Sequence, residues 1–147
     1  MGYYIDMAFK SNYETYEELL EFMVDFAKDW QGKKYLNPNT FIDREYIEDL
    51  LNDNVYFDVN GDICISVSTK YGSLIQKGIE EFTNKLIKED REEDFSLAEA
   101  GEEYDDYGVK GDYDYDVDVY VYKEIDPGLY KPAKLKKGAL FINIEID

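Results

Sequence analysis

The first third of the chain changes from a strand pattern to a helix pattern. Between Tyr3 and Phe9 every second position carries a large apolar side chain, which is the period of a strand with one buried face. Beyond Ser11 apolar side chains recur every three or four residues as far as Gly32, and Ser11 with Glu14 forms an S-x-x-E capping box. The apolar positions of this predicted helix are Tyr16, Leu19, Leu20, Met23, Phe26, Ala27 and Trp30.

Two further helices follow from the same kind of pattern. A shorter helix is predicted from about Asp43 to Asp53, after an Asn-Pro-Asn break at residues 37–39. Ser73 and Gln76 form a second capping box, in front of a stripe of apolar side chains at helical spacing.

A β-hairpin is predicted between the second and third helices. Two alternating runs at residues 55–68 flank Asn60-Gly61, a common hairpin turn. A three-residue loop keeps the apolar side chains on one face, and it pairs Val59 with Ile63 and Phe57 with Ile65. This register places Gly61 in the left-handed conformation.

Acidic and basic residues lie in separate segments of the second half of the chain. Residues 89–118 hold fourteen acidic residues and two basic ones, a net charge of −12. The part at about 89–111 has little periodicity and is predicted to be a loop or a short helix. A strand over 112–122, a basic connection at 131–137 and a last strand over 140–146 follow.

These elements predict a fold of the α+β class. We expect one domain over residues 1–147, with an antiparallel sheet of about five strands and about three helices packed on one face. The other face of the sheet is expected to be solvent-exposed and acidic.

The strand predicted at 112–122 carries an unusual row of carboxylates. Alternation places one set of side chains on the polar face, about 6.5 to 7 Å apart, and the set is Asp112, Asp114, Asp116, Asp118, Tyr120 and Tyr122. Like charges along a strand repel one another and are costly. They are explained by protection against edge-to-edge aggregation, by docking of a cationic partner, or by a metal site.

Two more groups of acidic and aromatic residues extend this pattern. One lies in the acidic segment and consists of Glu102, Glu103, Tyr104, Asp105, Asp106 and Tyr107. The other lies on the first helix and consists of Glu17, Glu21 and Asp25. Tyrosine among carboxylates suits an interface, because arginine of a partner stacks on the rings and pairs with the acids.

Composition and charge restrict the range of functions. The chain has 147 residues, 44% of them hydrophobic, and a net charge of −18. This charge repels nucleic acids and anionic membranes and attracts cationic partners, although salt adaptation or solubility would also produce it. The absence of His removes Ser-His-Asp and Cys-His catalysis. Cys64 is expected to be a small packing residue, and no segment resembles a leader or a membrane span, so a cytoplasmic location is expected.

The sequence therefore favours a binding protein over an enzyme. We expect a non-enzymatic acidic inhibitor that occludes the nucleic-acid-binding surface of a basic protein such as a nuclease, without binding nucleic acid or membranes itself. In size, acidity and clustered Asp and Tyr it is similar to immunity proteins against nuclease toxins and to phage-encoded DNA-mimic inhibitors of restriction or CRISPR systems. No catalytic residue, cofactor or metal ligand is assigned. The alternatives are a divalent-metal-binding protein or metal-dependent enzyme that uses the same acids, and a structural domain whose acidity serves solubility.

Overall fold

A computed structural model describes most of the chain. It covers residues 3–57, 61–102, 107–113, 118–126, 129–137 and 141–142, and from Asp118 onward it describes the backbone alone. Within these residues the fold class is α+β, with three α-helices, an antiparallel main sheet and a second, C-terminal sheet.

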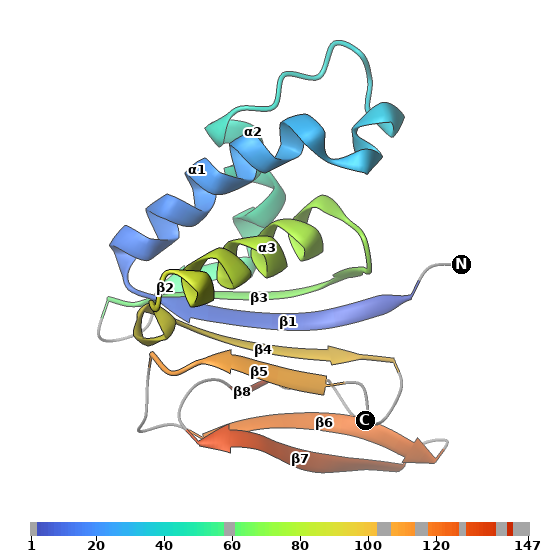
Figure 1. The fold of residues 1–147 in the computed structure, drawn as a ribbon. Helices are drawn as coiled ribbons and strands as arrows, with labels where there is room; N and C mark the ends of the chain where they lie inside the picture. Colours follow the sequence, from blue (N-terminus) through green and yellow to red (C-terminus); the bar gives the residue numbers. More distant parts are fainter. Residues whose placement is uncertain are drawn as a thin grey trace.

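The main sheet has the strand order β2-β3-β1-β4-β5, and every neighbouring pair in it is antiparallel. Its strands are β1 (Tyr4–Ser11), β2 (Val55–Phe57), β3 (Ile63–Lys70), β4 (Phe95–Gly101) and β5 (Tyr107–Gly111). The helices are α1 (Tyr13–Asp29), α2 (Arg44–Leu51) and α3 (Leu74–Lys88), and they lie on one side of the sheet (Figure 1). The prediction of an antiparallel sheet with helices on one face is confirmed in this outline.

The helix starts were predicted almost correctly. Asp43 caps α2 by accepting a hydrogen bond from the Tyr46 amide, and Ser73 caps α3 in the same way. The cap of α1 was assigned one residue too early. Ser11 is the last residue of β1, and the Asn12 side chain accepts the bond from the Thr15 amide at 2.8 Å.

The core lies between the helices and one face of the sheet. The apolar face predicted for the first strand is buried, with Met7 and Phe9 at 1% and 0% exposure. Phe9 stacks on Phe95 of β4 and makes a tilted contact with Phe82 of α3. The first strand, β1, is thus the central strand of the main sheet, with β3 on one side and β4 on the other. Its buried side chains form part of the core.

The hairpin prediction was right about Gly61 and wrong about the register. Gly61 has a φ of 82°, in the left-handed region. Val55 pairs with Ile65 and Phe57 with Ile63, which is two residues away from the predicted pairing. A shift of two keeps the apolar side chains on the same face, so the alternation alone does not distinguish the two registers.

The acidic segment at 89–111 was wrongly predicted to be a loop or a short helix. Five of its ten acids lie in and just before the 3₁₀ helix Glu92–Asp94, and strands β4 and β5 follow that helix. In β4 the apolar Phe95 and Leu97 alternate with Ser96 and Ala98, and all four are buried. The net charge of residues 89–118 did not reveal β4, because this strand of seven residues contains only one acid, Glu99.

The second face of the main sheet is solvent-exposed only in part, and the expected acidic face is not seen among its described residues. At its centre Ala8, Ala98 and Ala100 are exposed by 3%, 0% and 1%, although Ser66 on β3 is exposed. The C-terminal sheet approaches β1, β4 and β5, and it lies on the side away from the helices in Figure 1. The small side chains on this face allow that close approach.

The C-terminal sheet changes the interpretation of the aspartate row. Its strands are β6 (Asp118–Asp126), β7 (Leu129–Lys137) and β8 (Phe141–Ile142), in the order β7-β6-β8. Asp112 follows the end of β5 and is not in β6, so the prediction of one strand over 112–122 is wrong at its start. The predicted basic connection is strand β7, and its register places Lys137 opposite Asp118.

Candidate functional site

The residues predicted to bind a partner do not form one described cluster. Asp112 is half-buried beside the turn before β4, and its amide donates to the Glu92 carbonyl at 2.9 Å. Glu102 is exposed, and its carboxylate accepts from the Tyr4 amide at 2.9 Å. Asp118, Tyr120 and Tyr122 lie in β6, and Tyr107 begins β5. Asp114, Asp116 and residues 103–106 lie outside the described part of the chain.

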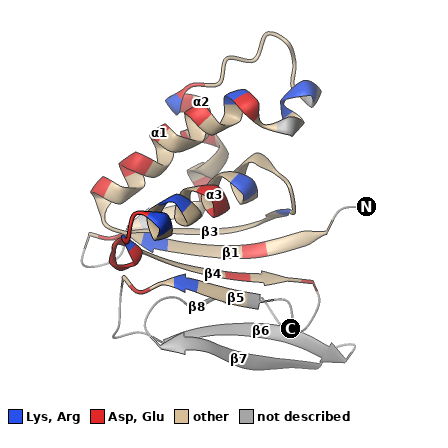
Figure 2. Ribbon diagram, in the orientation of Figure 1, with Lys and Arg blue, Asp and Glu red and all other residues tan. Residues whose placement is uncertain are grey.

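The acidic residues of α1 form a row on the surface of the described structure. Glu14, Glu18, Glu21 and Asp25 are exposed at spacings of four, three and four residues, and Figure 2 shows acidic positions along this helix. Such spacings place side chains in one row along a helix, at about 5.4 Å per turn. Glu17 lies beside this row and is half-buried.

Both arginines of the chain hold α1 to neighbouring elements. Arg44, at the start of α2, pairs with Glu17 through Nη2 and with Glu48 through Nε, the latter at 2.6 Å. On the other side of α1, Arg91 pairs with Glu18 at 2.7 Å and with Asp94 at 2.6 Å. The like charges along α1 are therefore partly compensated by long-range partners that local sequence spacing does not reveal.

The carboxylate of Glu17 is stabilised in its charged form. A hydrogen bond from the Tyr13 hydroxyl and the pairing with Arg44 lower the pKa of Glu17. The same contact with Glu17 raises the pKa of Tyr13, and burial raises the pKa of Tyr16. Both tyrosines are therefore neutral near pH 7, while Glu17 is ionised.

An open groove follows the row of acids on the side of α2. It has a volume of about 620 Å³, and it is lined by Glu21, Val24, Asp25, Lys28, Phe41, Ile42, Asp43 and Arg44. Phe41 is the most exposed large apolar side chain among the described residues, at 79%. Asp25 pairs with Lys28 along α1 at 3.1 Å, and both side chains remain largely in solvent. The groove thus combines an aromatic side chain with a charged rim in which three acids outnumber two bases.

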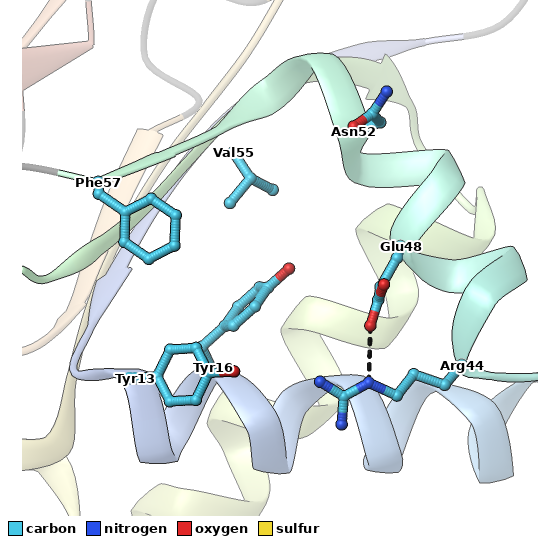
Figure 3. Close-up of a pocket in the computed structure, with 7 residues that line it drawn as sticks. All are labelled: Tyr13, Tyr16, Arg44, Glu48, Asn52, Val55 and Phe57. Atoms are coloured by element: carbon cyan, nitrogen blue, oxygen red, sulfur yellow. Dashed lines mark hydrogen bonds and ion pairs between the residues drawn. The ribbon is translucent and has the colours of Figure 1, made fainter.

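A second, smaller pocket lies at the other end of the α1–α2 surface. Its volume is about 330 Å³, and it is lined by Tyr13, Tyr16, Arg44, Glu48, Asn52, Val55 and Phe57 (Figure 3). Arg44 lines both the groove and this pocket, so the two form a continuous surface. We call this surface the α1–α2 face.

Sequence reasoning identified only part of the α1–α2 face. It selected Glu17, Glu21 and Asp25, but it missed Phe41 and Arg44. Phe41 has a visible signal, because an aromatic residue lies in a polar stretch between Pro38 and the cap of α2. Arg44 has a weaker sequence signal, which is that arginine is rare in this lysine-rich chain.

Three other features of the described residues bear on possible sites: the cysteine, possible metal ligands and membrane-spanning helices. Cys64 is buried at 5% exposure, as expected for a packing residue. In the part of the chain that the structure describes, no group of three His, Cys, Asp or Glu side chains is arranged to hold a metal ion. No helix among the described residues is long and apolar enough to cross a membrane.

Comparisons of the chain with protein-family models, with curated proteins and with solved structures find no match. Function therefore has to be argued from the site itself.

Proposed function

We propose that this protein is a non-enzymatic inhibitor that binds a cationic surface of a partner protein and keeps nucleic acid away from it. The partner is a basic protein, such as a nuclease or another nucleic-acid-binding protein. Carboxylates of the inhibitor occupy the places that phosphates would take, and its charge of −18 accelerates association with a basic partner.

The groove beside Phe41 is the observation that carries the proposal. Protein interfaces gain most of their affinity from a few aromatic or arginine anchors surrounded by a polar rim. Phe41 provides an exposed aromatic anchor, and the charged rim around it holds three acids against two bases, a net negative charge. The acids are Glu21, Asp25 and Asp43, and the bases are Lys28 and Arg44. A basic partner with an apolar contact point is complementary to such a surface.

The aspartates at 112–118 remain a second candidate contact. Asp118 stands opposite Lys137 in the sheet register, so β7 brings basic residues alongside this end of the row. We therefore expect the α1–α2 face to contribute more to affinity than the aspartate row.

Capture of the partner from host lysate tests the proposal. Three variants are compared with the wild-type protein at low and moderate salt. The groove variant carries Phe41→Ala, Glu21→Gln and Asp25→Asn, and the row variant carries Asn at 112, 114, 116 and 118. A control with Glu81→Gln and Asp90→Asn changes charge by the same two units as the groove variant, at exposed positions in the middle of α3 and just after its end.

The expected result is capture of one basic protein by the wild type and the control, and its loss in the groove variant. Duplex DNA or RNA should compete with capture, and the purified partner should lose nucleic-acid binding when the inhibitor is added. Equal capture by all variants, or a partner whose nucleic-acid binding is unaffected, contradicts the proposal. A toxin gene next to the gene for this protein would indicate an immunity role, and neighbouring phage genes would indicate counter-defence.

A further inference from the structure

The pocket at the N-terminal end of α1 has the composition of a cation-binding site. The rings of Tyr13, Tyr16 and Phe57 gather on one side, and the Arg44–Glu48 ion pair lies on the other (Figure 3). The two tyrosine rings are tilted by 53°, with their centroids 6.4 Å apart. Tilted aromatic rings around a small space are the arrangement that binds organic cations through their π faces.

The charged groups in the pocket and directly beside it leave an excess of negative charge. Among the residues that line it, Arg44 is the only cation and Glu48 the only carboxylate, and Arg44 also pairs with Glu17, which lies beside the pocket and does not line it. Since Tyr13 and Tyr16 have raised pKa values, they add no charge near pH 7. One positive charge against two negative ones disfavours an anionic ligand and favours a cation.

The size and accessibility of the pocket suit a single side chain. Its volume of about 330 Å³ is at the lower end of the range of roughly 300 to 1,000 Å³ in which proteins bind small ligands. Phe57 is 64% exposed and Tyr13 is 52% exposed, although each has a large apolar ring. The Glu48 side chain is 45% exposed and can accept further hydrogen bonds.

We propose that this pocket receives the guanidinium of an arginine side chain of the partner. A guanidinium is planar and weakly hydrated, so it stacks on tyrosine and phenylalanine rings while it donates to a carboxylate. An ammonium is compact and strongly hydrated, and it gains less from the same rings. The inference rests on the proposed function for the source of the arginine, and it adds a residue-level specificity to the α1–α2 face.

The test uses the intact protein and a probe that does not require the partner. Backbone amide NMR signals are followed while N-acetyl-arginine methylamide is added at low salt. The neutral isostere N-acetyl-citrulline methylamide and the lysine analogue are titrated in parallel. Phe57→Ala removes one ring of the pocket, and Tyr71→Ala removes an exposed ring outside the α1–α2 face.

The expected result is saturable signal shifts around Tyr13, Tyr16 and Phe57 with the arginine compound and none with the citrulline compound. Phe57→Ala should weaken binding about three-fold, while Tyr71→Ala should leave it unchanged. Shifts that spread over all acidic surfaces, equal binding of citrulline, or an unchanged affinity in Phe57→Ala overturn the inference. Equal affinity for the lysine analogue overturns the assignment to a guanidinium.

The pocket and the proposed inhibitor role can be tested separately. Binding of the arginine compound without capture of any partner would keep the pocket and remove the proposed inhibitor role. Capture of a partner that survives Phe57→Ala, together with no binding of the arginine compound, would keep the inhibitor role and remove the pocket.

Discussion

Gly111 ends β5 at a position that no other residue fits. Its φ is 79°, and a Cβ atom built there would lie 2.1 Å from the Phe95 carbonyl oxygen. The next two amides donate to Glu92 and Phe95, at 2.9 and 3.1 Å. Gly111 therefore allows the chain to turn tightly against the start of β4 at the end of the edge strand β5.

Replacement of Gly111 by alanine should destabilise the protein by about 2 kcal/mol or more, because left-handed strain and a backbone clash add together. Gly108→Ala is the matched control, since Gly108 lies in the same strand and its added Cβ meets nothing within 4 Å. Urea denaturation of both variants measures the difference. Similar midpoints for the two variants would contradict the close approach of Gly111 to β4.

Local turn and cap residues could be predicted from the sequence, whereas long-range ion pairs could not. Gly61 and the caps Asp43 and Ser73 were predictable, because turn and cap preferences act within a few residues. The pairing of Arg44 with Glu17 was not predictable, because it depends on how α2 packs on α1. The acids of α1 consequently looked unpaired in the sequence, and their like-charge spacing was given a functional meaning that the ion pairs partly remove.

At the scale of elements, α1 is tied to its surroundings by charge as well as by packing. Arg91 follows α3 and donates to Glu18 of α1 through Nη2 and to Asp94 through Nε. Hydrogen bonds to both carboxylates raise the pKa of Arg91, so it stays charged at every accessible pH. It links α1, the end of α3 and the turn before β4.

A double-mutant cycle should detect this link. Arg91→Gln is expected to destabilise the protein by up to about 1 kcal/mol, and Glu18→Gln should cost less in the Arg91→Gln background than in the wild type. Lys28→Gln breaks an exposed pair within α1 alone and should change stability by less than about 0.5 kcal/mol. Additive effects of Arg91→Gln and Glu18→Gln in chemical denaturation would show that the pair contributes nothing.

The strands were harder to predict than the helices, and β4 explains why. Its second face consists of small side chains such as Ala98 and Ala100, which carry no strong hydrophobic signal. Burial of this face depends on the C-terminal sheet, which lies far away in the sequence. A strand covered on both sides by distant elements cannot be recognised from local alternation alone.

Ala98→Leu tests whether the second face is covered. Ala98 is fully buried between Ala8 and Val109 on the neighbouring strands, so a larger side chain should cost about 1 to 3 kcal/mol through overpacking. Ser66→Leu is the matched control, because Ser66 lies on the same face opposite Ala8 but is exposed. Its effect should stay within about 0.5 kcal/mol. Equal thermal midpoints for the two variants would restore the expectation of a solvent-exposed second face.

At the scale of the whole molecule, the charge of −18 opposes folding while it supports the proposed function. Thirty-four acidic residues against sixteen basic ones leave many like-charge neighbours even after Arg44 and Arg91 have paired. Folding brings these charges together, and the resulting repulsion lowers stability. Under the proposed function, the same long-range field would speed the approach of a basic partner.

Stability should therefore rise with monovalent salt. Between about 10 mM and 1 M NaCl the screening length falls from about 30 Å to about 3 Å, so repulsion between acids weakens more than the short ion pairs do. The thermal midpoint, measured by circular dichroism, is expected to increase steadily over this range. A decrease would mean that attractive pairs dominate the electrostatics of the fold.

Divalent cations in the same experiment separate the inhibitor from a metal-binding protein. If the acids serve only as a docking surface, Mg²⁺ and Ca²⁺ should raise the midpoint gradually, as screening does. A specific site would instead give a saturating rise at micromolar to low millimolar metal, because a ligand that binds only the folded state stabilises it by mass action. A saturating rise that disappears when residues 112, 114, 116 and 118 become asparagine would assign the aspartate row to metal binding and leave the α1–α2 face as the candidate partner site.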